Sequence, residues 1–246
     1  MAKIAIIGGT GLTKLTDLSI ISREVHVSKY GESSAPLTRG TLGGVEVLFL
    51  PRHGAGHTIP PHKVNYRANI SVLASAGVNK VIAINAVGGI SDEMQPQVIA
   101  IPDQIIDYTW SRAHTYYEEG LEAVTHVDFT EPYCEELRQQ IISSANEAAV
   151  DVVDKATYAA TQGPRLESAA EINKLESDGC HVVGMTGMPE AGLARELNLC
   201  YASITVIANK AAGRGEGEIT IKDIEDNLVG GMSKVKRLLE TLIPKL

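Results

Sequence analysis

Short apolar runs that end in glycine pairs constrain how this chain can fold. Residues 3–9 and 80–89 each combine such a run with two adjacent glycines, and residues 45–51 hold a third run that proline ends. Apolar runs of this length are typical of strands buried on both faces of a sheet. Glycines after buried strands are typical of α/β sheets, which bind ligands at the carboxyl ends of their strands.

Helical patterns alternate with these runs, and no internal repeat or polar linker divides the 246 residues. The alternation predicts one α/β domain. Helices are expected over residues 64–76, 135–149, 169–177, 190–197 and 224–242, and a further strand over residues 201–208.

Composition excludes two kinds of partner. The net charge is −8 and no lysine- or arginine-rich run is present, so the chain lacks the basic surface that binds nucleic acid. No stretch reaches the ~20 apolar residues that span a bilayer, and the first residues do not form a signal peptide. We therefore expect no membrane contact and a cytoplasmic location.

Cysteine and histidine spacing indicates no metal site. Cys134, Cys180 and Cys200 are odd in number and lack a CxxC spacing, so we expect reduced thiols. The seven histidines show no HExxH-type ligand spacing. We expect neither a metal nor a cofactor.

The first glycine segment can hold a phosphate. Glycines at 8, 9 and 11 let backbone N–H groups converge on an anion, and the Thr10 hydroxyl adds a donor. A dinucleotide-binding loop would need a further glycine that this chain lacks. A plain turn at the end of a strand is the alternative.

Arg52 and His53 follow the strand over residues 45–50 directly. The guanidinium can bind two phosphate oxygens and His53 can donate a third hydrogen bond, whereas a surface ion pair is the alternative for Arg52. His57 and His62, beside two prolines, are interpreted as loop or subunit-contact residues rather than ligands.

Glu167 and Asn209 suit the edge of a purine. The Glu167 carboxylate, in a polar segment, can accept a hydrogen bond from N1–H of a 6-oxopurine but repels the N1 lone pair of adenine. Asn209 ends an apolar strand, and its amide can donate to the purine. The alternatives are an acid near a helix amino terminus and an amide that caps a turn.

Segments 4–12, 62–69 and 185–190 resemble the family of trimeric purine nucleoside and methylthioadenosine phosphorylases, and the similarity extends over essentially the whole chain. The resemblance implies one α/β domain over residues 1–246, with a central mixed sheet flanked by helices, and inorganic phosphate as co-substrate. It implies phosphate contacts at Thr10, Arg52, His53, Ala86 and Thr186, and a ribose contact at Met185.

The base site departs from the methylthioadenosine branch of that family. That branch typically has an aspartate at Asn209 and a small hydroxyl residue at Glu167, whereas this pair is similar to that of inosine- and guanosine-cleaving members. Ile221 matches a histidine that binds the 5′-hydroxyl in those members, and an apolar residue there suits a methylthio group.

The resemblance therefore implies phosphorolysis of S-methyl-5′-thioinosine to hypoxanthine and 5-methylthioribose 1-phosphate. Asn209 and Glu167 are implied to act on the purine and His53 on the phosphate. His126 matches the family segment that reaches the adjacent subunit of a homotrimer. The alternatives are an inosine or guanosine phosphorylase, a methylthioadenosine phosphorylase, or a nucleotide-binding module without catalysis.

Overall fold

The computed structural model describes residues 3–12 and 18–246. Its strands are β1 (Ile4–Gly8), β2 (Ser19–Glu24), β3 (Val27–Ser28), β4 (Gly31–Glu32), β5 (Leu37–Leu42), β6 (Val45–Pro51), β7 (Lys80–Gly89), β8 (Ile99–Ala100), β9 (Gln104–Asp107), β10 (Val152–Val153), β11 (Thr157–Ala160), β12 (Val182–Gly184) and β13 (Cys200–Lys210). The α-helices are α1 (Tyr66–Ser75), α2 (Glu135–Glu147), α3 (Ala169–Ser177), α4 (Glu190–Glu196) and α5 (Ile221–Leu242). Two short 3-10 helices cover Pro61–Lys63 and Ile243–Lys245.

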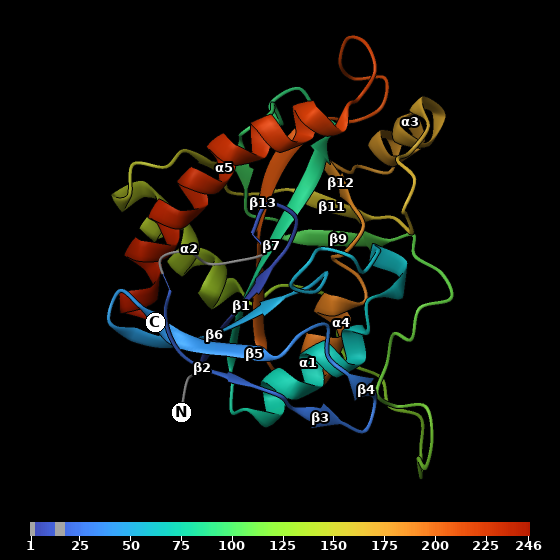
Figure 1. Ribbon diagram of the computed structural model, residues 1–246. Helices are drawn as coiled ribbons and strands as arrows, with labels where there is room; N and C mark the ends of the chain where they lie inside the picture. Colours follow the sequence, from blue (N-terminus) through green and yellow to red (C-terminus); the bar gives the residue numbers. More distant parts are fainter. Residues whose placement is uncertain (1–2, 13–17) are drawn as a thin grey trace.

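One mixed sheet forms the centre of the molecule (Figure 1). Its main path runs β10-β8-β13-β7-β1-β6-β5-β2, with β12, β11 and β9 branching from β7. Strands β6, β1, β7 and β13 pair in parallel. Their carboxyl ends consequently lie at one edge of the sheet, which is where α/β sheets bind ligands.

Alternate side chains of β1 face two different helical layers. Ile4 and Ile6 pack with residues of α2 and α5, whereas Ala5 and Ile7 pack with residues of α1 and α4. Successive side chains of a strand point to opposite faces, so a strand buried in this way must be covered on both sides. The expected α/β domain with a central mixed sheet flanked by helices is confirmed.

Helix α5 begins three residues earlier than the sequence pattern predicted. The Thr220 hydroxyl accepts a hydrogen bond from the backbone N–H of Asp223, which makes Thr220 the N-cap. Ile221 is therefore the first residue of the helix and is 75% exposed. Within the described ranges, no helix is long and apolar enough to cross a membrane.

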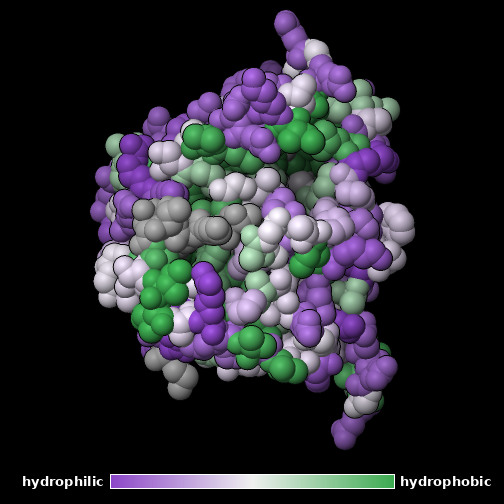
Figure 2. Space-filling model, in the orientation of Figure 1, coloured by the Kyte–Doolittle hydropathy of each residue, from purple (hydrophilic) through white to green (hydrophobic). Residues whose placement is uncertain are grey.

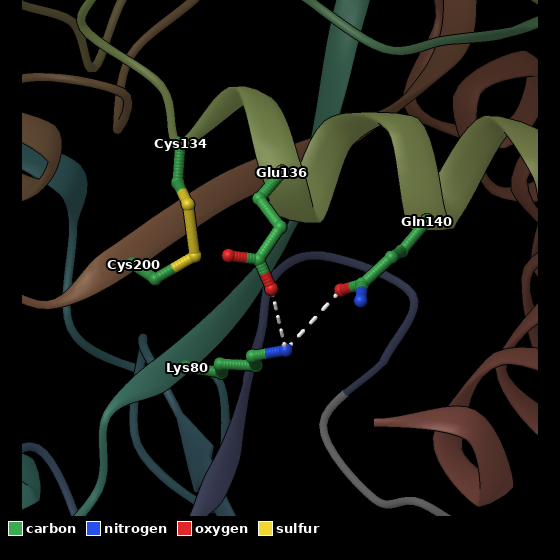
Figure 3. The surroundings of a disulfide bond; sticks show 5 residues. All are labelled: Lys80, Cys134, Glu136, Gln140 and Cys200. Atoms are coloured by element: carbon green, nitrogen blue, oxygen red, sulfur yellow. Dashed lines mark hydrogen bonds and ion pairs between the residues drawn. A yellow bond between two sulfur atoms is a disulfide. The ribbon is translucent and has the colours of Figure 1, made fainter.

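The expectation of three reduced thiols is wrong for two of them. Cys134 and Cys200 form a disulfide across 66 residues of sequence (Figure 3). Cys180 is a free, buried thiol. Cys134 precedes α2 and Cys200 begins β13, and the Cys134 backbone N–H donates to the Tyr201 carbonyl. The sheet thus brings together two cysteines that sequence spacing does not relate.

Candidate active site

A cavity of about 400 Å³ opens at the carboxyl ends of the parallel strands. Its volume suits a small-molecule ligand. Eight of the ten residues expected at the site line it: Thr10, Arg52, His53, Ala86, Glu167, Met185, Thr186 and Asn209. They come from five strand ends and the loop before α3, so the fold gathers side chains that lie up to 199 positions apart, from position 10 to position 209.

Arg52 meets a carboxylate that was not assigned a role from the sequence. Its Nε and Nη2 donate to the two oxygens of Glu190 at 2.6 and 2.7 Å, and Nη1 donates to the Ile84 carbonyl at 3.0 Å. The expected fork onto phosphate is therefore directed to Glu190 instead. A guanidinium has five N–H groups, so two remain for a ligand.

This ion pair is fully buried, with both side chains 0% exposed. Burial acts to lower the pKa of Arg52, but the Glu190 carboxylate outweighs it and holds that pKa above its ordinary value. The Tyr201 hydroxyl also donates to Glu190 at 2.9 Å. Gly9 passes so close that a Cβ there would lie 2.9 Å from Nη1 of Arg52, which explains the glycine.

His53 is held by a backbone carbonyl. Its Nδ1 lies 2.8 Å from the Ile59 oxygen, and a carbonyl can only accept, so Nδ1 carries the hydrogen. Burial, followed by the charge of Arg52, lowers the pKa of His53 from 6.5 to about 4. The ring is therefore neutral near pH 7 and its Nε2 is an acceptor, contrary to the expected donor.

His57 belongs to the cavity rather than to a peripheral loop. Its Nε2 lies 3.4 Å from the Thr10 hydroxyl, its ring centroid is 4.8 Å from that of His53, and it lines the cavity. Its φ of 53° is in the left-handed region that non-glycine residues rarely adopt. Such conformations cluster at functional sites, and no sequence pattern predicts this one.

A buried chain of hydrogen bonds holds Thr186. The Asn85 amide nitrogen donates to the Thr186 hydroxyl oxygen at 2.8 Å, and the Ser203 hydroxyl donates to the Asn85 amide oxygen at 2.9 Å. Asn85 and Ser203 are 1% and 2% exposed. Because the Thr186 oxygen already accepts a bond, its own hydrogen is available to a ligand in the cavity.

Glu167 and Asn209 both line this cavity. Glu167 accepts a hydrogen bond of 2.6 Å from the Thr161 hydroxyl, which leaves further lone pairs free. Asn209 follows a register shift in the pairing of β13 with β7, and its amide nitrogen donates one hydrogen to the Lys210 carbonyl at 2.7 Å. The second amide hydrogen and the amide oxygen remain for a ligand.

Arg112 organises the loops around Met185. It is 9% exposed and donates to the backbone oxygens of Thr161, Gln162, Met185 and Met188. A lone arginine in a loop gives no sequence signal of this role.

Gly163 lies close to Met185. It has a φ of 60°, and a Cβ there would lie 2.3 Å from the Met185 sulfur. A glycine is therefore required for Met185 to lie as it does.

Two expected residues are not brought to the cavity. Ile221 points outward because it starts α5, and the apolar wall is formed instead by Ile219 and Ile224. In Figure 2 hydrophobic side chains gather around a hollow beneath the start of α5. His126 is exposed in the long segment between β9 and α2, which runs along the outside of the molecule in Figure 1.

No cluster of histidine, cysteine, aspartate or glutamate that could hold a metal ion occurs within the part of the chain that the structure describes. The cavity wall instead combines one paired arginine, neutral hydrogen-bonding groups and one unpaired carboxylate. Such a site can bind a small oxyanion at one end and a polar heterocycle at the other.

Known proteins match this chain over nearly its full length. The family model described as "Phosphorylase superfamily" matches residues 3–244. A probable S-methyl-5'-thioinosine phosphorylase from Xanthomonas campestris is 48% identical over 240 residues, covering 97% of this chain and 96% of its own length. A 6-oxopurine nucleoside phosphorylase from Pyrococcus furiosus is 42% identical over 250 residues, covering 99% and 93%.

A solved structure shares the fold. Methylthioadenosine phosphorylase from Schistosoma mansoni in complex with adenine superposes with a TM-score of 0.95 at 29% identity, covering 100% of this chain and 92% of that one.

Proposed function

The chain belongs to the phosphorylase superfamily, and we propose that it cleaves S-methyl-5′-thioinosine with inorganic phosphate. The products are hypoxanthine and 5-methylthioribose 1-phosphate, which makes the protein a pentosyltransferase. The observation that carries the proposal is one cavity that joins Glu167 and Asn209 to an apolar wall of Ile219 and Ile224. The names of the relatives from Xanthomonas and Pyrococcus support the same substrate class.

Phosphate binds beneath the sugar in this proposal. Thr10, Thr186 and the two free N–H groups of Arg52 donate to its oxygens, and the backbone at Ala86 lies beside it. A phosphate oxygen bonds to the anomeric carbon as the bond from that carbon to purine N9 breaks. Monohydrogen phosphate loses its proton in forming the product ester, and the departing purine gains one.

The purine is read by two side chains. Glu167 accepts N1–H of hypoxanthine, and the free amide hydrogen of Asn209 donates to N7, where negative charge grows as the base departs. A donor aimed at developing charge lowers the barrier, because its bond is stronger in the transition state than in the ground state. No side chain acts as a nucleophile, and positioning supplies most of the acceleration.

Met185 contacts the ribose, and the 5′-methylthio group packs on Ile219 and Ile224. Burying a hydroxyl against this wall without a partner costs roughly 1–3 kcal/mol, which disfavours inosine. Ile219 and Ile224 thus take the 5′ contact that was expected at Ile221 from the sequence. An apolar residue is still expected there, because it suits a methylthio group.

Assembly and location are further parts of the proposal. A homotrimer would allow the segment carrying His126 to reach a neighbouring cavity, and the exposed Leu121, Val124 and Val127 of that segment would be covered. We place the enzyme in the cytoplasm.

Variants of the apolar wall test the choice of substrate. In Ile224→Asn, a polar group beside the 5′ position should raise kcat/KM for inosine relative to methylthioinosine by about tenfold, which corresponds to about 1.4 kcal/mol. Ile221→Asn is the matched control, since Ile221 is 75% exposed and should leave the ratio unchanged. A ratio that moves in the control but not in Ile224→Asn would contradict the assigned wall.

A further inference from the structure

The tautomer of His53 determines how that residue can bind an oxyanion. Nδ1 donates to the Ile59 carbonyl at 2.8 Å, so the neutral ring presents a lone pair at Nε2. Within the described ranges no side chain or backbone group hydrogen bonds to Nε2. His53 lines the cavity beside Arg52, Thr10 and His57, all of which lie in the region assigned to phosphate.

A bare lone pair beside an anion repels it unless the anion brings its own hydrogen. Protonation of the ring would remove the repulsion, but Arg52 next to His53 and the burial of the ring both oppose a second positive charge there. The oxyanion must therefore supply the proton of this contact. Monohydrogen phosphate carries one P–OH group, which can donate while the other three oxygens accept.

We propose that His53 binds phosphate as a hydrogen-bond acceptor, with Nε2 accepting the P–OH hydrogen. The inference rests on the proposed function and deepens its phosphate site. Arg52, Thr10 and Thr186 donate to the oxygens that carry charge, so the site combines several donors with one acceptor. This arrangement recognises both the charge of the oxyanion and the presence of one proton on it.

The proposal predicts different affinities for four tetrahedral dianions of similar size, according to whether each carries an O–H group. Monohydrogen phosphate and monohydrogen arsenate keep an O–H group near pH 8. Sulfate has none, and monofluorophosphate carries fluorine where phosphate carries the hydroxyl. The first two should bind alike, whereas the last two should bind at least about tenfold more weakly, because they leave Nε2 facing an unprotonated atom.

Equilibrium titration calorimetry at pH 8, with each of the four ions added to the whole protein, measures this directly. We expect the dissociation constants of sulfate and monofluorophosphate to exceed that of phosphate by about tenfold or more, and that of arsenate to match it within about threefold. Sulfate and monofluorophosphate binding within about twofold of phosphate would overturn the proposal.

Two variants assign the discrimination to His53. His53→Asn keeps an amide donor for the Ile59 carbonyl but has no atom at the position of Nε2. Phosphate should therefore bind about tenfold more weakly, whereas sulfate should bind at least as tightly as in the wild type, because the repelling lone pair is gone. His53→Gln can place its amide oxygen there and should recover part of the preference for phosphate. Equal preference for phosphate in the wild type and in a folded His53→Asn would contradict the role of Nε2.

The outcomes also distinguish this inference from the proposed function. If phosphate-dependent base release is observed but the four ions bind equally, only the inference about His53 fails. If none of the four ions binds and no base is released, the proposed function fails and the inference falls with it.

Discussion

Arg52 enters the cavity with its charge already paired. Glu190 takes both hydrogens of the guanidinium fork, and the two side chains are 0% exposed. Two buried charges are costly unless they compensate each other, so the pair acts as one neutral unit that still offers N–H groups to the ligand. In the proposed function, phosphate therefore binds mainly through fixed hydrogen bonds rather than through a net positive charge.

Neutralising Glu190 should destabilise the protein. In Glu190→Gln the buried guanidinium loses its counter-charge, so we expect the free energy of unfolding to fall by about 3 kcal/mol. Phosphate should restore part of this loss, because it supplies the missing negative charge. Urea unfolding with and without phosphate measures both effects.

Glu147→Gln is the control for that experiment. Glu147 pairs with Lys245 at the surface, where both side chains are more than 40% exposed. Its loss should cost less than about 1 kcal/mol. An equal loss of stability in the two variants would contradict the account of the buried pair.

The low pKa of His53 predicts a dependence of stability on pH. The folded value is about 4 and the ordinary value is 6.5, so the unfolded chain binds the proton more readily. The contribution is complete above about pH 6.5 and is lost as the pH falls toward 4. Between pH 7 and pH 5 the free energy of unfolding should fall by about 2 kcal/mol from this group.

Urea titrations of the wild type and His53→Asn at both pH values check this sign. Between pH 7 and pH 5, we expect the free energy of unfolding of the variant to fall by about 2 kcal/mol less than that of the wild type. An identical fall in the two proteins would mean that His53 is not held neutral.

Residues that follow buried strands could be predicted from the sequence, whereas their partners could not. Thr10, Arg52 and Asn209 lie at strand ends, and parallel strands bring those ends together. Glu190 is 138 positions from Arg52, and no periodic pattern relates the two. The placing of His57 depends on a left-handed backbone that is visible only in the folded chain.

At the scale of elements, the capping of α5 decides which isoleucines reach the cavity. The apolar periodicity of the helix begins at Ile224, but the Thr220 hydroxyl caps the helix one turn earlier. This shift turns Ile221 to solvent and leaves Ile224 facing inward. Long periodic helices and buried strands were predictable. Strands β9, β11 and β12 were not, because each has only three or four residues and shows no clear periodic pattern.

The disulfide joins two elements and should contribute to stability without affecting catalysis. Closing a loop of 66 residues is expected to contribute roughly 4 kcal/mol by the chain-entropy model. The oxidised protein should therefore unfold at a higher urea concentration than the reduced one. Neither cysteine lines the cavity, so kcat should be the same in both forms.

The double variant Cys134→Ser with Cys200→Ser is the control. Its unfolding midpoint should match that of the reduced wild type and should not respond to a reducing agent. A midpoint that is unaffected by reduction in the wild type would contradict the pairing of these two cysteines.

On the scale of the whole molecule, one edge of the sheet brings together a base site and a sugar site that are similar to those of different branches of the family. In the proposed function, Glu167 and Asn209 suit a 6-oxopurine, and the apolar wall of Ile219 and Ile224 suits a methylthio sugar. The overall α/β architecture followed from strand and helix periodicity. The assembly could not be derived in that way, because subunit contacts depend on the shape of exposed loops such as the segment that carries His126.

The most direct test of the central claim is the kcat/KM for phosphate-dependent base release from methylthioinosine, inosine and methylthioadenosine. We expect methylthioinosine to exceed inosine by roughly ten- to a hundredfold, because the apolar wall leaves a 5′-hydroxyl without a partner. Methylthioadenosine should also be poorer, because Glu167 faces a lone pair at N1, and no base should be released without phosphate. Equal efficiency on inosine and methylthioinosine, or highest efficiency on methylthioadenosine, would contradict the account.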